Sequence, residues 1–314
     1  MKEDQYMITR RKLFESTTAI GVAMLASPAS FAEKHESNMA ARIFFDSYGA
    51  LALRQAVHYA GDDGFVASLP QILRARVNAD YDNIIWNTWF TANSEESVVT
   101  TPQGNHVVVA VHGGGILGTP ERFERSAYAD MDHRNAEGIT GQGAAKITRQ
   151  EARDVLDGKL PDGSEIPVYA FDEFRRGIND LPIHYGVITD FELARKTEKG
   201  FTPFDVLKEE PNFIVRAGGV EAAADYLDMF QVRHDTRLMG NFHPFDRIDP
   251  DQPQTRVIFL AGNKGGVGSE GDYFYGYDSD YGIGGYAHMI GIARYVAVAP
   301  RDVSVRGLRG QDFE

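Results

Sequence analysis

The chain of 314 residues contains no cysteine. This absence excludes disulfide bonds, thiol nucleophiles, cysteine-ligated zinc and iron–sulfur clusters, so stability has to come from core packing. Basic residues are also scarce, because 32 Lys and Arg against 45 Asp and Glu give a net charge of −13. Nucleic acids and anionic membranes favour clustered Lys and Arg, so neither is expected as a partner. The 43% hydrophobic and 25% charged content predicts a globular protein.

Long hydrophobic runs are missing as well, and the apolar run nearest the start, residues 17–26, is too short to span a bilayer at about ten residues. The preceding segment TRRKLF, residues 9–14, resembles the twin-arginine export motif, and residues 30–32 are suitable for signal peptidase. This order of basic, apolar and small residues is typical of a secretory signal. We predict that residues 1–32 are an export signal read by the export machinery, and that the mature protein is periplasmic or secreted. The alternative is an ordinary N-terminal helix with two arginines.

Residues 33–314 are predicted to form a single α/β domain. Apolar residues at helical spacing predict a helical segment over 38–90, and 91–104 is predicted to be a polar loop before a sheet-containing core over 105–300. Helices are expected at about 149–156, with Thr148 as N-cap, and at 220–230. The fold class expected is α/β, with a mixed or mostly parallel sheet flanked by helices. The strand candidates are 107–111, 166–171, 184–189, 213–216, 256–261 and 295–299.

Several of these strand candidates end in glycine or in a polar residue. The run 107–111 leads into His112 and three glycines, 184–189 leads into Asp190, and 256–261 leads into a loop with Asn263 and Lys264. The carboxyl ends of parallel strands share one edge of a sheet, and ligands bind there. We therefore expect a crevice with His112 at its centre, acting as an acid–base group or metal ligand, and with Asp190 as its carboxylate partner.

Oxygen and imidazole donors elsewhere extend this predicted site. Asp130, Asp132, His133, His184 and His243 are donors of the kind that zinc, manganese, iron or calcium accept. Twin-arginine signals are associated with proteins that cross the membrane folded around a cofactor, which also favours a bound metal. The predicted catalytic residues are His112, Asp190, His133 and His288; the predicted ligand-binding residues are Gly113, Gly114, Arg216, Asn263, Lys264 and Tyr281; the predicted metal ligands are Asp132, His133 and His112.

Three short stretches resemble known motifs. The turn at 112–115 resembles the oxyanion loop of α/β-hydrolase esterases, but no serine has the Gly-x-Ser-x-Gly context that this fold requires. Residues 264–268 resemble a phosphate-binding loop without its second lysine or following helix, so no nucleotide is expected. The stretch YFYGYDSDYGIGGY, residues 273–286, includes a sequence similar to the start of a calcium loop. Its tyrosines and carboxylates suit a sugar, an aromatic or a cationic ligand, and the alternative is a loop that closes over the core.

These patterns predict an exported enzyme, a hydrolase or lyase, that acts on a small molecule by acid–base or metal-assisted catalysis. Two alternatives stay open. One is a periplasmic solute-binding protein that holds an anionic small molecule with Arg216 and Lys264, and the other is a structural protein without a pocket. The substrate, the metal and the oligomeric state do not follow from the sequence.

Overall fold

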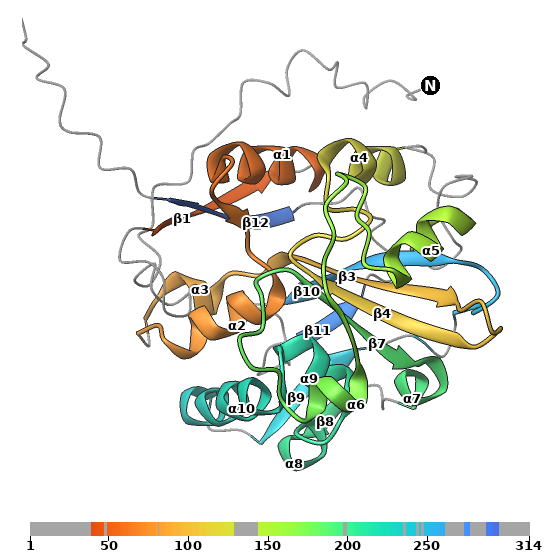
Figure 1. The fold of residues 1–314 in the computed structure, drawn as a ribbon. Helices are drawn as coiled ribbons and strands as arrows, with labels where there is room; N and C mark the ends of the chain where they lie inside the picture. The colour runs from red at the N-terminus through yellow and green to blue at the C-terminus, as the bar shows by residue number, and fades with distance from the viewer. Residues whose placement is uncertain are drawn as a thin grey trace, which may run out of the picture.

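The first and last strands of the described chain lie side by side in a small antiparallel sheet. The computed structural model describes residues 39–46, 49–80, 82–128, 144–196, 200–234, 237–242, 245, 248–260, 273–276 and 287–294. Strand β1 (Met39–Asp46) pairs antiparallel with β12 (Ala287–Arg294), and the short β2 (Phe65–Val66) pairs with the other edge of β12. Helix α1 (Gly49–Ala60) covers this sheet (Figure 1).

The beginning of the helical segment predicted over 38–90 is therefore a strand. The segment that contains Ile43, Phe44 and Phe45 is rich in β-branched and aromatic side chains, which favour a strand, and it finds a partner about 250 residues later in the chain. The next part of the segment, α1, is helical as predicted, and it buries the small face formed by Ala52, Leu53 and Ala56.

A larger sheet forms the centre of the molecule. Among the described residues its strand order is β6-β7-β4-β3-β10-β11-β9-β8, with β5 also paired to β10. The neighbouring pairs are antiparallel except for β6 with β7 and β11 with β9. The strands are β3 (Phe90–Thr100), β4 (His106–His112), β5 (Ala145–Lys146), β6 (Val168–Ala170), β7 (Tyr185–Asp190), β8 (Gly200–Pro203), β9 (Leu238–Phe242), β10 (Gln254–Leu260) and β11 (Tyr273–Gly276).

The sequence predicted a mixed or mostly parallel sheet, and the large sheet is mixed but its strand pairs are mostly antiparallel. The predicted loop 91–104 is mostly strand β3, which joins β4 through a tight turn, and a tight turn can connect only antiparallel strands. The turn closes with the N–H of Thr101 donating to the carbonyl of Asn105 at 2.8 Å, and Gly104 adopts a φ of +88°. The mixed α/β composition itself is confirmed.

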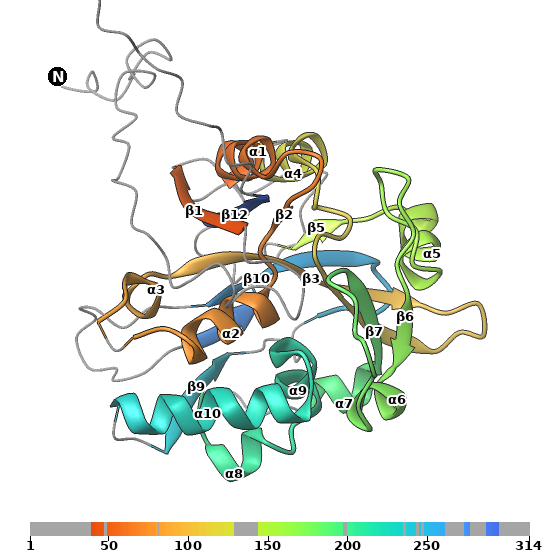
Figure 2. The same ribbon diagram turned by 60° about the vertical axis from the view of Figure 1, so that its left-hand side comes forward.

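Helices lie on both sides of these sheets. In two views, α1 and α4 lie beyond the small sheet, whereas α2, α9 and α10 lie on the opposite side of the large sheet (Figures 1 and 2). No helix in the described part of the chain is long and apolar enough to cross a membrane. The remaining helices are α2 (Leu69–Val77), α3 (Ile84–Asn87), α4 (Pro120–Tyr128), α5 (Arg149–Leu156), α6 (Phe171–Arg175), α7 (Phe191–Arg195), α8 (Phe204–Leu207), α9 (Pro211–Ala217) and α10 (Val220–His234).

Local signals explain two of these helices. The prediction for α5 is confirmed, because the hydroxyl of Thr148 accepts from the N–H of Glu151 and the Glu151 carboxylate accepts from the N–H of Thr148. The strand predicted at 213–216 is wrong, since this segment belongs to α9. Pro211 in the first turn and Gly218 with a φ of +93° at the C-terminus fix a helix there, despite its β-branched residues.

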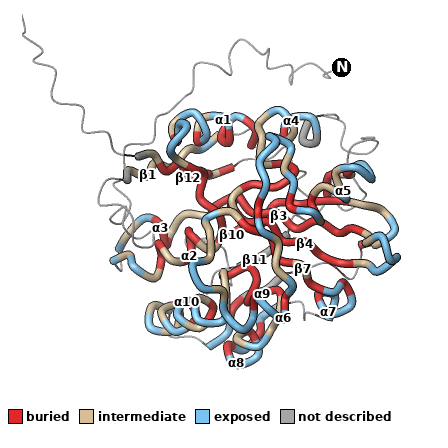
Figure 3. The backbone as a smooth tube through the Cα atoms, viewed as in Figure 1, coloured by how far each residue is buried: buried red, intermediate tan, exposed pale blue. Residues whose placement is uncertain are grey.

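The largest hydrophobic core lies between the large sheet and helices α2, α3, α9 and α10. Its centre contains the buried side chain of Arg76, which donates to the carbonyls of Ile85 and Thr88 and to the hydroxyl of Tyr226, each at 3.0 Å. The Tyr226 ring stacks on Trp86 with centroids 5.9 Å apart. Buried backbone continues from this core along the strands of the large sheet (Figure 3). The sheet is therefore covered on the face where α2 and α10 pack.

Candidate functional site

Strand β3 places a row of polar side chains in the middle of the large sheet. Ser94, Glu95, Glu96 and Ser97 are each no more than 3% exposed, and β3 lies between β4 and β10. Successive side chains of a strand point to opposite faces, so Glu95 and Glu96 project to different sides of the sheet. Sequence reasoning missed this strand because a polar run normally indicates a loop. The only local sign was the pair Val98 and Val99 at its end.

On one face, the Glu96 carboxylate binds two arginines. The Nε and Nη2 atoms of Arg216, from α9, donate to its two oxygens at 2.6 Å each, and Nη2 of Arg256, from β10, donates at 2.9 Å. The Arg256 guanidinium also lies 4.0 Å from the centroid of the Phe245 ring. All three charged side chains are almost completely buried. Arg216 therefore fastens α9 to the sheet, and the prediction that it holds an anionic ligand is not supported by its position.

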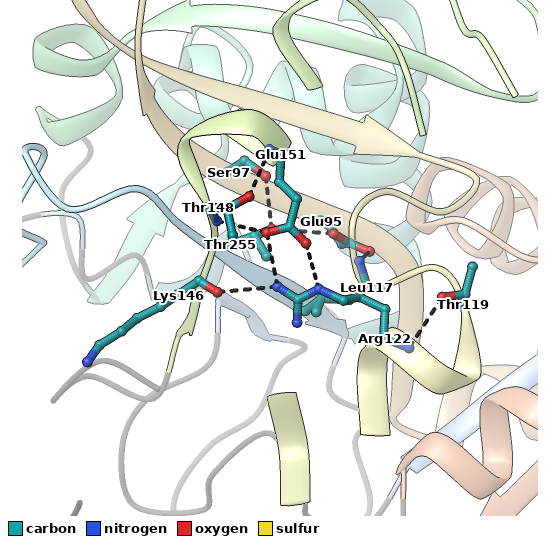
Figure 4. A network of polar contacts seen from close by, with 9 residues as sticks. All are labelled: Glu95, Ser97, Leu117, Thr119, Arg122, Lys146, Thr148, Glu151 and Thr255. Carbon is teal, nitrogen blue, oxygen red and sulfur yellow. Dashed lines mark hydrogen bonds and ion pairs between the residues drawn. The ribbon is translucent and has the colours of Figure 1, made fainter. Parts of the chain in front are cut away.

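On the other face, the Glu95 carboxyl holds the turn that follows β4. Its Oε1 accepts from the backbone N–H of Gly115 at 3.1 Å. The same oxygen accepts from the N–H of Leu117 at 2.8 Å, and Oε2 accepts from the Thr255 hydroxyl at 3.3 Å (Figure 4). Burial raises the pKa of Glu95 to about 7, although the hydrogen bonds and the positive charge of Arg122 oppose this shift.

A second cluster lies beside Glu95, where α4 meets α5. Nε of Arg122 donates to the Glu151 carboxylate at 2.7 Å, and Nη2 donates to the carbonyl of Lys146 at 3.3 Å (Figure 4). The same carboxylate caps α5 through the N–H of Thr148. The β3 side chains and this cluster thus connect α4 and α5 to the large sheet through polar contacts.

The predicted central residue, His112, lies inside the core. It is fully buried, its Nδ1 is 2.9 Å from the Ser94 hydroxyl, and its Nε2 is 3.0 Å from the carbonyl of Val215. Burial lowers its pKa to about 4, so the ring is neutral at pH 7. Both ring nitrogens are occupied by protein partners. In this position His112 acts as a structural residue that links β4, β3 and α9.

The predicted pairing of His112 with Asp190 is wrong. Strands β4 and β7 are antiparallel, so His112 is opposite Tyr185, while Asp190 is opposite Val107 at the far end. A distance of five residues along a strand is about 17 Å. Asp190 instead caps α7, with its carboxylate accepting from the N–H of Leu193 at 3.0 Å.

The histidine beside the glycine turn is His184. If β4 and β7 were parallel, His184 would lie at the edge of the sheet opposite to His112. The two strands are antiparallel, and Tyr185, the residue after His184, is opposite His112, so His184 lies at the same edge. The ring of His184 packs against Gly113, and burial lowers its pKa. Its Nε2 atom is buried without a hydrogen-bond partner among the described residues.

The predicted ligand-binding glycines, Gly113 and Gly114, adopt φ angles of +98° and +107°. Their N–H groups both donate to the carbonyl of Asn93, at 2.9 and 3.1 Å. These donors are therefore used inside the protein and do not form an oxyanion hole. The glycines are needed for backbone conformation and for close packing.

Replacing Gly113 with alanine tests this packing role. A Cβ at this position would lie 2.0 Å from a ring carbon of His184. Gly104 has a similar φ of +88°, and a Cβ added there would meet no atom within 4 Å, so Gly104→Ala isolates the backbone strain. We expect Gly113→Ala to lower the free energy of unfolding by about 2 kcal/mol more than Gly104→Ala, measured by urea unfolding. Equal losses for the two variants would contradict the packing role.

His288 lies in the small sheet, apart from the other candidates. It is opposite Phe45 in the β1–β12 register, with ring centroids 4.4 Å apart, and its ring meets Trp89 edge-on at 4.3 Å. Burial lowers its pKa to about 4. Within the described ranges no group of three or more His, Asp or Glu side chains could hold a metal ion. Asp130, Asp132, His133, His243, Asn263, Lys264 and Tyr281 lie outside the described residues, so the divalent metal stays a prediction.

The mixed α/β fold with mostly antiparallel sheets is a C-type lectin-like fold, as its similarity to one solved structure shows. One solved structure, from work on the accommodation of massive sequence variation in Nanoarchaeota by the C-type lectin fold, is similar to this chain with a TM-score of 0.57. The two chains are 25% identical, and the match covers 82% of this chain and 100% of that one. Neither a protein-family model nor a curated protein matches the sequence.

This similarity corrects the predicted function. It is a similarity to a C-type lectin fold, and it gives no support to a hydrolase or lyase. The structure agrees with this correction at two of the expected active-site residues, because His112 has both nitrogens hydrogen-bonded inside the core and Asp190 caps a helix. The anion-binding alternative depended in part on Arg216, which is buried against Glu96.

Proposed function

We propose that the chain is an exported ligand-binding protein of C-type lectin-like fold, in which a buried polar scaffold supports surface segments that tolerate substitution. The observation that carries this proposal is the similarity to a C-type lectin-fold protein that accommodates massive sequence variation. The internal bonding of Glu95, Glu96 and His112 adds support, since these groups stabilise strand and turn positions without depending on surface residues.

We place the ligand contacts in the sequence between β10 and β12, which includes Asn263, Lys264 and Tyr281. Its YFYGYDSDYGIGGY stretch is rich in tyrosine, glycine and aspartate. Tyrosine provides a large contact area at low cost in side-chain entropy, and glycine and serine provide adaptable loops, which is why antibody binding loops use the same residues. Strand β11 holds part of this stretch against β10, with Tyr275 in register with Phe259. The ligand classes that these side chains suit are sugars and aromatic or cationic groups.

Replacing Tyr281 with alanine tests the position of the binding surface. We expect wild-type protein to bind members of an array of oligosaccharides and lysine-rich peptides, and Tyr281→Ala to weaken that binding by about tenfold or more. The control is Val232→Ala on α10, at the most exposed of the large hydrophobic side chains described (81%). Unchanged binding by Tyr281→Ala would contradict the proposed location, and an array without any bound member would contradict the ligand classes.

Export is tested by changing both arginines of the signal. We expect Arg10→Lys together with Arg11→Lys to retain the protein in the cytoplasm, because the twin-arginine pathway reads that pair. Mass spectrometry of the secreted wild-type protein should give an N-terminus near Glu33. Unchanged localisation of the double variant would contradict the twin-arginine interpretation.

A further inference from the structure

The turn that follows β4 is built around the Glu95 carboxyl. Gly115 and Leu117 both direct their N–H groups at Oε1, and a Cβ on Gly115 would lie only 2.8 Å from Oε2. The turn therefore reaches the carboxyl because glycine leaves room for it. A further hydrogen bond comes from the Thr255 hydroxyl of β10. Together these groups, Glu95 with Gly115, Leu117 and Thr255, are called the Glu95 anchor below.

The anchored turn lies immediately before α4. The turn continues directly into α4, whose Arg122 reaches across to Glu151 of α5 and whose Glu124 accepts from Arg54 of α1 at 3.2 Å. A change in the turn is thus passed to a helix that contacts both α1 and α5.

The hydrogen bonds to the Glu95 carboxyl come from two backbone N–H groups and one hydroxyl. Arg122 of α4 is the positive group that acts on it, and this guanidinium is itself bound to Glu151 of α5. Thr255 of β10 contributes a neutral hydroxyl. The adjacent Glu96 projects to the opposite face, where its own arginines lie. A negative charge at Glu95 is therefore stabilised mainly by N–H and O–H donors.

We propose that the Glu95 anchor is a proton-dependent switch: the protonated carboxyl holds the 113–118 turn and α4 closely, and loss of the proton loosens them. The neutral carboxyl keeps Oε1 as acceptor for the two N–H groups and can donate its proton to Thr255, so no charge is buried. The ionised carboxylate is a buried charge, and hydration would lower its free energy. Water can reach the carboxylate only if the turn moves away from it, so ionisation favours the open turn. The transition lies near neutral pH, because burial raises the pKa of Glu95 to about 7 from 4.5.

Amide hydrogen exchange at Gly115 and Leu117 tests the switch. In the open state Glu95 lies in water and has an ordinary pKa. Between pH 4.5 and 7 its carboxyl is therefore protonated in the closed state and ionised in the open state, so a rising pH favours opening. After correction for intrinsic exchange rates, we expect the opening equilibrium of these two amides to increase on the order of a hundredfold from pH 5 to pH 8 in wild-type protein. In Glu95→Gln, which keeps the acceptor and carries no charge, opening should not change with pH.

The control is Glu151→Gln, which should keep the pH dependence because it leaves Glu95 in place. Equal opening at both pH values in wild-type protein, or a pH dependence that persists in Glu95→Gln, would overturn the proposal. If the glutamine variant does not fold, the substitute test is a pH titration of the Glu95 carboxyl in the wild-type protein, followed by carbon NMR. A midpoint near 7, shared by the Leu117 amide shift, supports the switch, and a midpoint near 4.5 overturns it.

Discussion

Replacing Glu96 with glutamine is expected to lower the free energy of unfolding by about 3–5 kcal/mol. The substitution removes the negative charge that Glu96 supplies to Arg216 and Arg256, while both guanidinium groups stay in the core. The control is Glu151→Gln, which removes a carboxylate from a partly exposed ion pair with Arg122 and should cost about 1 kcal/mol or less. Urea unfolding followed by circular dichroism measures both. Equal losses would contradict a structural role for the buried cluster.

The buried cluster also predicts a compensating variant. Replacing Glu96 with leucine and both arginines with methionine removes all three charges together and fills a similar volume. Buried ion pairs replaced in this way by apolar groups often leave stability unchanged or increase it. We therefore expect the triple variant to be more stable than Glu96→Gln.

Replacing His112 with alanine is expected to lower the free energy of unfolding by about 2–4 kcal/mol, through a cavity and through the lost partners of Ser94 and Val215. His58 is an exposed histidine on α1, and His58→Ala should be close to neutral. Denaturant unfolding at pH 7 compares the free energies of unfolding of the two variants. A free energy of unfolding for His112→Ala as high as that of His58→Ala would contradict the structural role.

The same histidine makes the protein sensitive to acid. Its pKa is lowered to about 4 in the folded protein, while the unfolded chain binds a proton near pH 6.5. The stabilisation from the neutral ring is therefore complete above pH 6.5 and is lost as the pH falls to about 4, a change of about 3 kcal/mol. Glu95 has the opposite sign, since its raised pKa makes the fold less stable as the pH rises from 4.5 to 7. Glu95→Gln should consequently steepen the loss of stability in acid.

The elements that sequence reasoning found are those with strong local signals. Strand β4 was predicted from its unbroken run of valine and alanine, and α5 with Thr148 as its N-cap. The pairing of strands was not predicted, because it depends on which runs are neighbours in space. The strand that decides this pairing, β3, is polar, and its burial becomes favourable only when Arg216, Arg256 and the turn at Gly115 supply partners from distant parts of the chain.

The candidate site was misplaced for the same reason. His112 does lie at the end of the valine-rich strand, as the sequence indicated, but a parallel sheet was assumed in order to bring Asp190 beside it. Local sequence also could not distinguish a buried, hydrogen-bonded histidine from an accessible one. Gly113 and Gly114 were predicted to bind a ligand, and they instead serve the contacts with Asn93 and His184.

The central claim, a stable scaffold with a substitutable binding segment, is tested most directly by the thermal unfolding midpoint of one multiple variant. Tyr277, Tyr281 and Tyr286, all between β11 and β12, are replaced together by serine. The proposal predicts a cooperative transition with a midpoint within about 4 °C of wild type, which corresponds to about 1 kcal/mol. Loss of the cooperative transition, or a decrease as large as that of Glu96→Gln, would show that these tyrosines belong to the scaffold and would contradict the account.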